Sequence, residues 1–179
     1  MDIKEEKKAI RRRVAELKGA VSMEEKLRLS EIIMAKLEVL PDFIASNTVL
    51  LYYSLPDEVQ TEAFLNKWCD RKRIVLPVVE GDDLILKIYR PSMVNVGYKQ
   101  IMEPAGTEIV EPHEIELAVI PGVAFDLSNN RLGRGKGFYD RLLPHIKCKM
   151  VGLGFGFQIV DRIPMEPFDR PVELVLCDQ

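Results

Sequence analysis

The chain concentrates glycine and positive charge in one short run, NNRLGRGKGFYDR, at residues 129–141. At its centre glycines and cations alternate, at Gly133, Arg134, Gly135, Lys136 and Gly137. Glycine lets the backbone come close to a ligand, and successive N–H groups at a helix start attract anions. Arginine and lysine add full charges, and arginine grips phosphate oxygens with two nitrogens. The run therefore predicts a binding site for nucleotide phosphates.

The residues around this centre suit the same chemistry. Arg131 supplies another cation, and Asp140 follows closely enough to hold Mg²⁺ against bound phosphates. A simpler interpretation is a solvated turn, with Asp140 as a helix-start acid favoured by the helix dipole. Five alternating residues between a predicted strand and a predicted helix nevertheless favour the anion site.

The run matches neither of the common nucleotide-binding motifs. A Walker A loop needs glycine where this chain has Asn130, and serine or threonine where it has Gly137. The dinucleotide pattern G-x-G-x-x-G fails because Phe138 and Phe157 stand where its last glycine should be. The sequence thus excludes a P-loop and gives no evidence for a dinucleotide site.

Helical periodicity is clearest near the start of the chain. Ile3, Ile10, Val14 and Leu17 recur at helical spacing, and Gly19 offers an end to this helix.

A second helix is predicted over residues 22–40. Ser22 and Glu25 form a capping-box pattern at its start, and Pro41 breaks the pattern at its end. The expected apolar stripe consists of Met23, Leu27, Ile33, Leu37 and Leu40.

Strand-like and helical segments alternate along the rest of the chain. The predicted strands lie within residues 48–54, 73–79, 84–90, 115–125, 149–155 and 171–177, and the one in 115–125 should end at a Pro-Gly turn. Further helices are expected at 61–71, with Trp68 in the core, and at 138–146. Pro77 should mark a strand end or an edge, and residues 91–114 should form a long irregular connection. The alternation predicts a single α/β domain over residues 1–179, with a largely parallel sheet flanked by helices.

Charge and cysteine content narrow the classes of function. The net charge is −3 and the sequence pI about 5.6, which disfavours a dedicated nucleic-acid binder. Cys69, Cys148 and Cys177 form no C-x-x-C pair, so we expect reduced thiols. The N-terminus lacks the apolar core of a signal peptide, and no apolar run reaches the length of a membrane span. We therefore expect a cytoplasmic protein without membrane contact.

The glycine-rich run and its upstream flank, PGVAFDLSNNRLGRGKGFYDR, resemble the signature of the 5-formyltetrahydrofolate cyclo-ligase family, also called methenyltetrahydrofolate synthetases. KKAIR at 7–11, LPDEVQTE at 55–62 and FGFQIVDRIPMEPFDRPVELVLCD at 155–178 resemble other family elements. The resemblance covers nearly the whole chain and implies a Rossmann-like, three-layer α/β domain.

The resemblance also implies a reaction. The formyl oxygen of 5-formyltetrahydrofolate attacks the γ-phosphate of ATP with Mg²⁺ present, and N10 then displaces phosphate. The products are 5,10-methenyltetrahydrofolate, ADP and phosphate. The expected partners are ATP and the folate, with or without a polyglutamate tail; nucleic acid is not expected, and we take the chain to act as a monomer.

The resemblance assigns roles to individual residues. Arg134 and Lys136 are the expected catalytic residues, Tyr53, Glu58 and Phe138 would contact the folate, and Asp140 and Glu173 would bind Mg²⁺. At position 173 the family usually has aspartate, and Asp169 is expected to support the site from nearby. The expected ATP contacts are Lys7, Lys8, Ala9, Ile10, Arg11, Arg131, Leu132, Gly133, Arg134, Gly135, Lys136, Gly137, Phe138 and Tyr139.

Several of these residues have simpler interpretations when taken alone. Lys7 and Arg11 share one face of a helix that carries many other cations, so they could simply belong to a solvated basic face. Tyr53 could be an ordinary strand aromatic, and Glu58 a turn acid. His113 and His145 are too isolated to suggest a metal site or a catalytic triad.

Two other classes of function stay open on the sequence alone. One is another phosphate-using α/β enzyme, such as a relative of sugar-phosphate isomerases. The other is a nucleic-acid-binding module that uses the basic helix and the Arg-Gly loop, with salt-sensitive binding as its mark.

Overall fold

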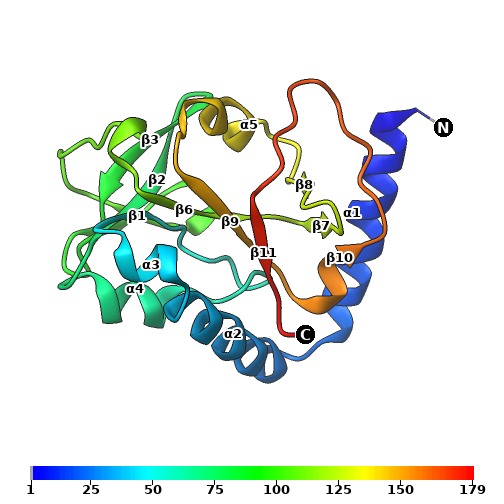
Figure 1. The fold of residues 1–179 in the computed structure, drawn as a ribbon, viewed down its shortest axis with the longest axis horizontal. Coiled ribbons are helices and arrows are strands. Elements are labelled where there is room, and N and C mark those ends of the chain that lie inside the picture. The colour runs from blue at the N-terminus through cyan, green and yellow to red at the C-terminus, as the bar shows by residue number, and fades with distance from the viewer. Residues whose placement is uncertain (1) are drawn as a thin grey trace.

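A computed structural model describes residues 2–179, and its centre is a six-stranded sheet (Figure 1). The strands lie in the order β11–β9–β6–β1–β2–β3. Their bounds are β1 Thr48–Leu50, β2 Arg73–Glu80, β3 Asp83–Ile88, β6 Leu117–Pro121, β9 Lys149–Leu153 and β11 Leu174–Leu176. All neighbours pair in parallel except β2 and β3, which form an antiparallel hairpin.

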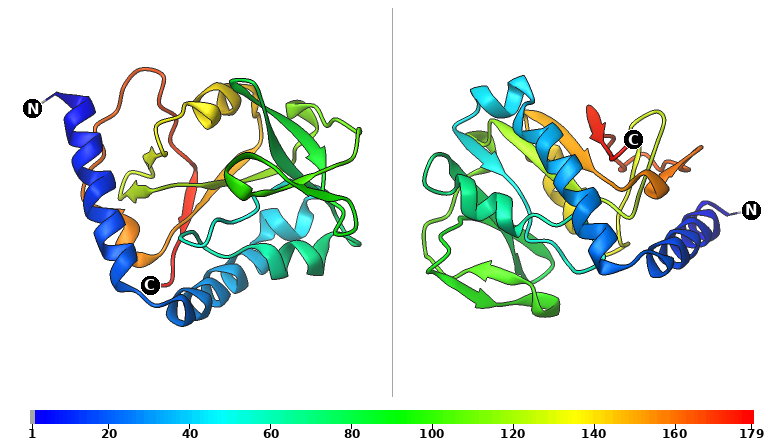
Figure 2. Two further views of the ribbon diagram at one scale, coloured as in Figure 1. Left: turned by 180° about the vertical axis from the view of Figure 1, so that it is seen from behind. Right: turned by 90° about the horizontal axis from the view of Figure 1, so that it is seen from below.

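Helices cover both faces of this sheet (Figures 1 and 2). Their bounds are α1 Ile3–Ala20, α2 Met23–Glu38, α3 Pro41–Ala45, α4 Glu62–Trp68 and α5 Phe138–Leu142. Alternate sheet residues point to opposite sides: Val49 packs in one core with α2, α3 and α4, whereas Leu50 packs in the other with α5 and the turn after it. This arrangement confirms the predicted Rossmann-like, three-layer α/β fold.

The strand order reverses between β1 and β6, because the chain builds β1, β2 and β3 to one side and β6, β9 and β11 to the other. In open α/β sheets ligands bind beyond the carboxyl ends of the strands at such a switch point. The segment after β1 contains Glu58, and the segment after β6 leads through two short strands into the glycine-rich run.

The second helix begins as predicted but packs differently. The Ser22 hydroxyl accepts a hydrogen bond from the Glu25 N–H at 3.1 Å, which confirms the N-cap. Ile33 and Leu37 are buried, but Met23 and Leu27 are each nearly half exposed. The predicted stripe is wrong at its start, because only the later turns of α2 pack on the sheet core.

Two prolines agree with the prediction in their local setting, since α2 ends before Pro41 and β2 is paired on one side only at Pro77. Pro41 is the first residue of α3, where its missing N–H costs nothing. Pro77 lies inside β2, opposite Leu86 of β3, and β2 has strands on both sides. Val75 is the last β2 residue that pairs with β1, so Pro77 stands where β2 has only one strand neighbour.

The predicted irregular connection contains some regular structure. Within residues 91–114 the strands β4 Val94–Val96 and β5 Met102–Pro104 pair antiparallel. The apolar run at 115–125 forms β6, which ends at Pro121 beside the predicted Pro-Gly turn, and a second strand, β7 Ala124–Asp126, begins after Gly122. No helix in residues 2–179 is both long and apolar enough to cross a membrane.

Candidate functional site

A small second sheet carries the glycine-rich run. It consists of β7 Ala124–Asp126, β8 Arg131–Leu132 and β10 Ile159–Val160. β8 runs antiparallel to β7, so the chain returns toward the carboxyl end of β6 before it reaches Gly133. Val14 of α1 packs with Ala124 and Leu132, which places the basic helix beside the run, as Figure 1 shows.

Asp126 fixes the turn between β7 and β8. One carboxylate oxygen accepts hydrogen bonds from the N–H groups of Ser128 and Asn130, at 2.9 and 3.0 Å. The other accepts from the Asn130 amide and the Ile163 N–H, both at 2.9 Å. Burial raises the pKa of the Asp126 carboxyl, but these four donors outweigh it and lower the pKa overall. The carboxylate therefore holds the base of the glycine-rich run rigidly.

The backbone of the run uses its glycines as predicted. Gly135 and Gly137 have φ of +85° and +75°, and Gly137 is the N-cap of α5. The Arg11 side chain donates from Nε to the carbonyl oxygen of Gly133 at 2.9 Å, which ties α1 to the run.

A cavity of about 540 Å³ opens between α1, the run and the segment before β11. It has more cationic than acidic side chains. The lining residues are Lys4, Glu5, Lys7, Lys8, Arg11, Arg131, Leu132, Gly133, Gly135, Lys136, Gly137, Asp140, Glu166, Phe168 and Asp169. The structure thus brings both predicted phosphate-binding segments, 7–11 and 131–140, to one place.

Lys7 is buried rather than part of a solvated basic face. Its ammonium lies 2.7 Å from the carboxylate of Glu166 and 2.5 Å from that of Asp169. Burial lowers the pKa of Lys7, but hydrogen bonds and charge from Asp169 and Glu166 outweigh it and raise the pKa. The solvated interpretation of Lys7 is wrong, whereas Lys8 is exposed at the cavity.

Arg131 is also buried, at the back of the cavity. Its Nε donates to the carbonyl oxygen of Pro121 at 2.7 Å, and one Nη lies 3.6 Å from Asp140. The guanidinium lies over the ring of Tyr139, 5.0 Å from its centre. Burial lowers the pKa of Arg131, although the charge of Asp140 opposes this. Arg131 therefore presents a fixed positive charge to the cavity.

Lys136 and Arg134 occupy exposed positions in the run. The ammonium of Lys136 makes no hydrogen bond or ion pair within the described residues. Arg134 instead reaches to the loop after β1: its Nη2 lies 2.7 Å from Asp57 and 3.0 Å from Glu58. A predicted catalytic cation and a predicted folate contact therefore touch directly.

The predicted folate contacts are only partly brought together. Phe138 packs edge-on against Tyr98, with ring centres 5.7 Å apart. Glu58 accepts a hydrogen bond from the Leu55 N–H at 2.9 Å as well as the bonds from Arg134. Tyr53 packs against the core on the side of the sheet that carries α2 and α4. Its pKa is raised, mainly by burial and to a smaller extent by a hydrogen bond with Glu62.

Of the two predicted metal ligands, only Asp140 lines the cation-lined cavity. Glu173 lies just before β11, at its amino end, and its carboxylate accepts the Met150 N–H at 2.7 Å. Residues 2–179 contain no cluster of three or more side chains suited to a metal ion. The assignment of Glu173 as a direct ligand therefore has no support here, and its carboxylate caps the β9 backbone instead.

Several residues at this site were not predicted from the sequence. Glu166 forms an ion pair with Lys7. Asp57 forms ion pairs with both Arg134 and Lys18, and the ring of Tyr98 packs against that of Phe138. Asp57 and Glu166 lie inside stretches that carried the family resemblance, which was a usable signal. Lys18 and Tyr98 gave none, because only the folded chain brings them to the site.

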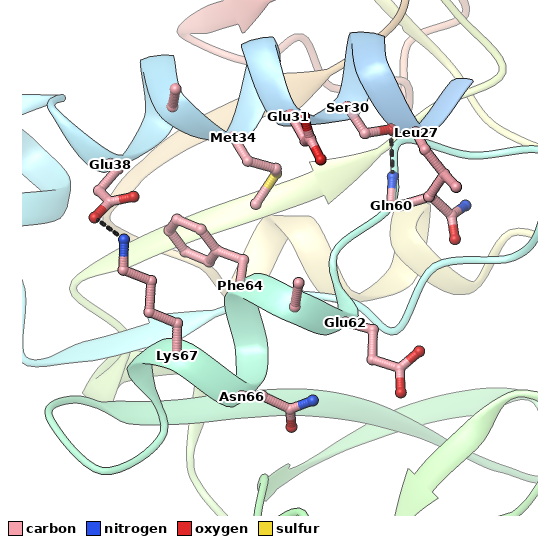
Figure 3. Close-up of a pocket in the computed structure, with 12 residues that line it drawn as sticks. Leu27, Ser30, Glu31, Met34, Glu38, Gln60, Glu62, Phe64, Asn66 and Lys67 are labelled. Atoms are coloured by element: carbon pink, nitrogen blue, oxygen red, sulfur yellow. Dashed lines mark hydrogen bonds and ion pairs between the residues drawn. The ribbon is translucent and has the colours of Figure 1, made fainter. Parts of the chain in front are cut away.

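A second cavity, of about 590 Å³, lies between α2 and α4, away from the predicted residues. Figure 3 shows Met34 and Phe64 pointing toward one another there, with the Glu38–Lys67 ion pair at one end. Glu31 and Glu62 also line it, so its unpaired charge is negative. Such a lining repels phosphate, and we place the candidate site at the cation-lined cavity despite its slightly smaller volume.

Comparison with known proteins agrees with this geometry. The model of the 5-formyltetrahydrofolate cyclo-ligase family matches residues 3–178. The chain belongs to this family. A 5,10-methenyltetrahydrofolate synthetase of Aquifex aeolicus has a similar structure, with a TM-score of 0.89 and 37% identity over 97% of this chain and 90% of that one.

Two further relatives extend the comparison. A 5,10-methenyltetrahydrofolate synthetase of Mycoplasma pneumoniae has a TM-score of 0.76 and is 27% identical, covering 97% of this chain and 99% of that one. A 5-formyltetrahydrofolate cyclo-ligase of Escherichia coli is 27% identical over 91% of this chain and 95% of its own length. Family membership confirms the predicted enzyme class, a ligase of folate metabolism, over the two alternative classes.

Proposed function

We propose that this chain catalyses the ATP-dependent cyclisation of 5-formyltetrahydrofolate to 5,10-methenyltetrahydrofolate, with release of ADP and phosphate. The observation that carries the proposal is the contact between Arg134 of the glycine-rich run and Glu58 of the loop after β1. It joins a cation-lined cavity suited to a triphosphate to a carboxylate suited to the N–H groups of a pterin.

The chemistry needs positioning more than a protein nucleophile. The formyl oxygen attacks the γ-phosphorus as the bond to ADP breaks, which converts a poor leaving group into a phosphate ester. N10 then attacks the activated carbon, loses its proton, and the C–O bond breaks to release phosphate. Electrostatic stabilisation of the moving charge is therefore the main catalytic demand.

Residues of the cavity meet this demand in distinct ways. The backbone at Gly135 and Gly137 lets N–H groups approach phosphate oxygens. Lys136, whose ammonium has no partner in residues 2–179, would follow the charge as it moves to the leaving oxygen. Arg131 supplies a fixed positive charge from behind, and Lys8 one from α1.

The donor set also fits Mg²⁺ bound mainly through the nucleotide. Mg²⁺ typically takes one or two carboxylates together with substrate phosphates and water, so one carboxylate at the cavity, that of Asp140, would suffice, while Glu166 and Asp169 pair with Lys7. When bound, the ion would neutralise phosphate charge. Asp140 is held near Arg131 at 3.6 Å, which keeps its carboxylate in place.

Asp140→Asn tests this metal role. We expect the Mg²⁺ concentration for half-maximal activity to rise at least about tenfold, because an amide binds Mg²⁺ more weakly than a carboxylate. Asp161→Asn, at an exposed aspartate outside the cavity, serves as the control. A Mg²⁺ titration that matches the control would remove Asp140 from the metal site.

For the folate, Glu58 would accept hydrogen bonds from the pterin, and Phe138 would pack against it near Tyr98. Tyr53 stays an expected contact, although in this structure it faces the core beside α4.

Isotope transfer tests the proposed reaction step. The substrate is prepared with ¹⁸O in the formyl group and incubated with ATP, Mg²⁺ and the protein. Phosphorylation of the formyl oxygen requires this atom to leave with the γ-phosphate, so mass spectrometry should find one ¹⁸O in each released phosphate. Unlabelled phosphate, formed together with the methenyl product, would refute the proposed step.

A further inference from the structure

Arg134 is held by one edge only. Its Nη2 is shared between Asp57 at 2.7 Å and Glu58 at 3.0 Å, and its Nε lies 3.4 Å from Glu58. Its other terminal nitrogen, Nη1, has no hydrogen-bond partner among residues 2–179. The guanidinium can therefore keep both carboxylates and still offer one nitrogen to a ligand.

Lys18 completes the charge balance of this group. It is buried in α1, and its ammonium lies 3.4 Å from the carboxylate of Asp57. Burial lowers the pKa of Lys18, although the charge of Asp57 opposes this. Two carboxylates on one guanidinium would leave an excess negative charge, and Lys18 makes the group two anions with two cations.

The four residues come from three separate segments. Lys18 belongs to α1, Asp57 and Glu58 to the loop after β1, and Arg134 to the glycine-rich run. A small cavity of about 160 Å³ is lined by Lys18, Asp57 and Arg134, together with Arg11, which also lines the candidate site. The group thus lies at the border of the proposed nucleotide cavity.

We propose that Asp57, charge-balanced by Lys18, is the positioning residue that fixes Arg134 between the two substrates. Asp57 accepts a hydrogen bond from Nη2 of Arg134, and the second carboxylate oxygen of Glu58 accepts one from the Leu55 N–H. Nη1 of Arg134 is then available to a phosphate oxygen of the nucleotide. The proposal rests on the proposed function, since it gives Arg134 a phosphate to meet. It predicts that loss of Asp57 slows the chemical step without removing any group that touches substrate.

Kinetics of four variants separate positioning from a merely structural ion pair. Asp57→Asn keeps the shape but not the charge, and we expect kcat per folded molecule to fall about tenfold. Lys18→Met should give a similar loss, and Lys18→Arg should recover most of the activity because it keeps the charge. Arg13→Met removes an exposed cation from the same helix and should leave kcat and both KM values within about twofold of the parent chain.

A measurement without substrate follows Arg134 directly. In ¹⁵N-labelled protein the Nε–H signal of Arg134, assigned by its loss in Arg134→Lys, should change in Asp57→Asn and not in Arg13→Met. If the signal changes and kcat falls, the positioning role is supported. If Asp57→Asn is folded and keeps kcat and both KM values, or if the Arg134 signal does not move, the role is wrong. A parent chain that makes no methenyl product would instead refute the proposed function.

Discussion

The two large cavities of this molecule are similar in volume, at about 540 and 590 Å³, but differ in how they are built. The α2–α4 cavity is lined only by residues between Leu27 and Lys67, from two helices and the segment before α4. The cation-lined cavity draws its residues from α1, the glycine-rich run, α5 and the segment before β11. The cation-lined cavity thus joins segments from the start and the end of the chain, whereas the α2–α4 cavity joins segments that are close in sequence.

The two cavities also differ in whether a lysine at each one has an ion-pair partner. Lys67 at the α2–α4 cavity lies 2.5 Å from Glu38, so its charge is already satisfied. Lys136 at the cation-lined cavity has no anionic partner within residues 2–179. A cationic side chain without an ion-pair partner, on a glycine-rich segment, therefore identifies the phosphate-binding site better than cavity volume does.

Lys136→Ala should show the largest effect. We expect kcat to fall by a factor on the order of 100 or more, because a cation directed at the developing phosphate charge is lost. The side chain is exposed, so the free energy of unfolding should change by less than about 0.5 kcal/mol. Steady-state kinetics and chemical denaturation measure the two quantities.

The matched control is Lys67→Ala at the other cavity. Its kcat should stay close to that of the parent chain, since this lysine only pairs with Glu38 on the surface. Equal losses of activity in the two variants would contradict the distinction between the cavities.

Asp126→Asn should mainly affect stability. The amide nitrogen would face the donors of Asn130 and Ile163, so we expect the free energy of unfolding to fall by about 2–3 kcal/mol. The folded pKa of Asp126 is lowered, so its contribution is present above the ordinary aspartate pKa and lost as pH falls through the folded value.

Denaturant titrations between pH 7 and pH 2 therefore test both the stability that Asp126 contributes and the pH at which that stability is lost. The parent chain should lose stability below about pH 4, and the loss should be smaller in Asp126→Asn because it no longer has this group to protonate. Identical acid profiles would show that the Asp126 carboxylate does not stabilise the turn that carries the site.

Gly137→Ala should have a moderate effect. At a φ of +75° an alanine costs about 1 kcal/mol, and its Cβ would also displace the Arg141 guanidinium. We expect a melting temperature a few degrees lower and a clear rise in KM for ATP, because the run changes shape. Gly81→Ala, also at positive φ but outside both cavities, controls for strain alone and should leave KM unchanged.

Ala63→Met should have the smallest effect. It adds volume inside the α2–α4 cavity, where no predicted site residue lies, so kcat and both KM values should remain within about twofold. A rise in KM for the folate of tenfold or more would move part of the substrate site to this cavity.

The sequence predicts the fold well because its signals are local. Apolar runs and helical spacing place the strands and helices, and the Ser22 cap confirms one boundary. Met23 and Leu27 share that helical spacing yet are exposed, because the pattern alone does not tell how far α2 extends past the sheet.

The site is less predictable because it depends on contacts across the chain. The residue types of the glycine-rich run indicate an anion site, but the burial of Lys7 against Glu166 requires segments 159 positions apart. The same holds for Arg134 with Asp57, and for Glu173, which the family pattern assigns to metal but the fold directs to the β9 backbone.

The most direct test is to mix the protein with 5-formyltetrahydrofolate and Mg²⁺, with and without ATP, and follow the near-ultraviolet absorbance of the methenyl product. We expect this band to grow only with ATP, with one phosphate released per product formed, and to be lost in Lys136→Ala. Folded protein that binds ATP but forms no product would contradict the assigned reaction while leaving the phosphate site in place.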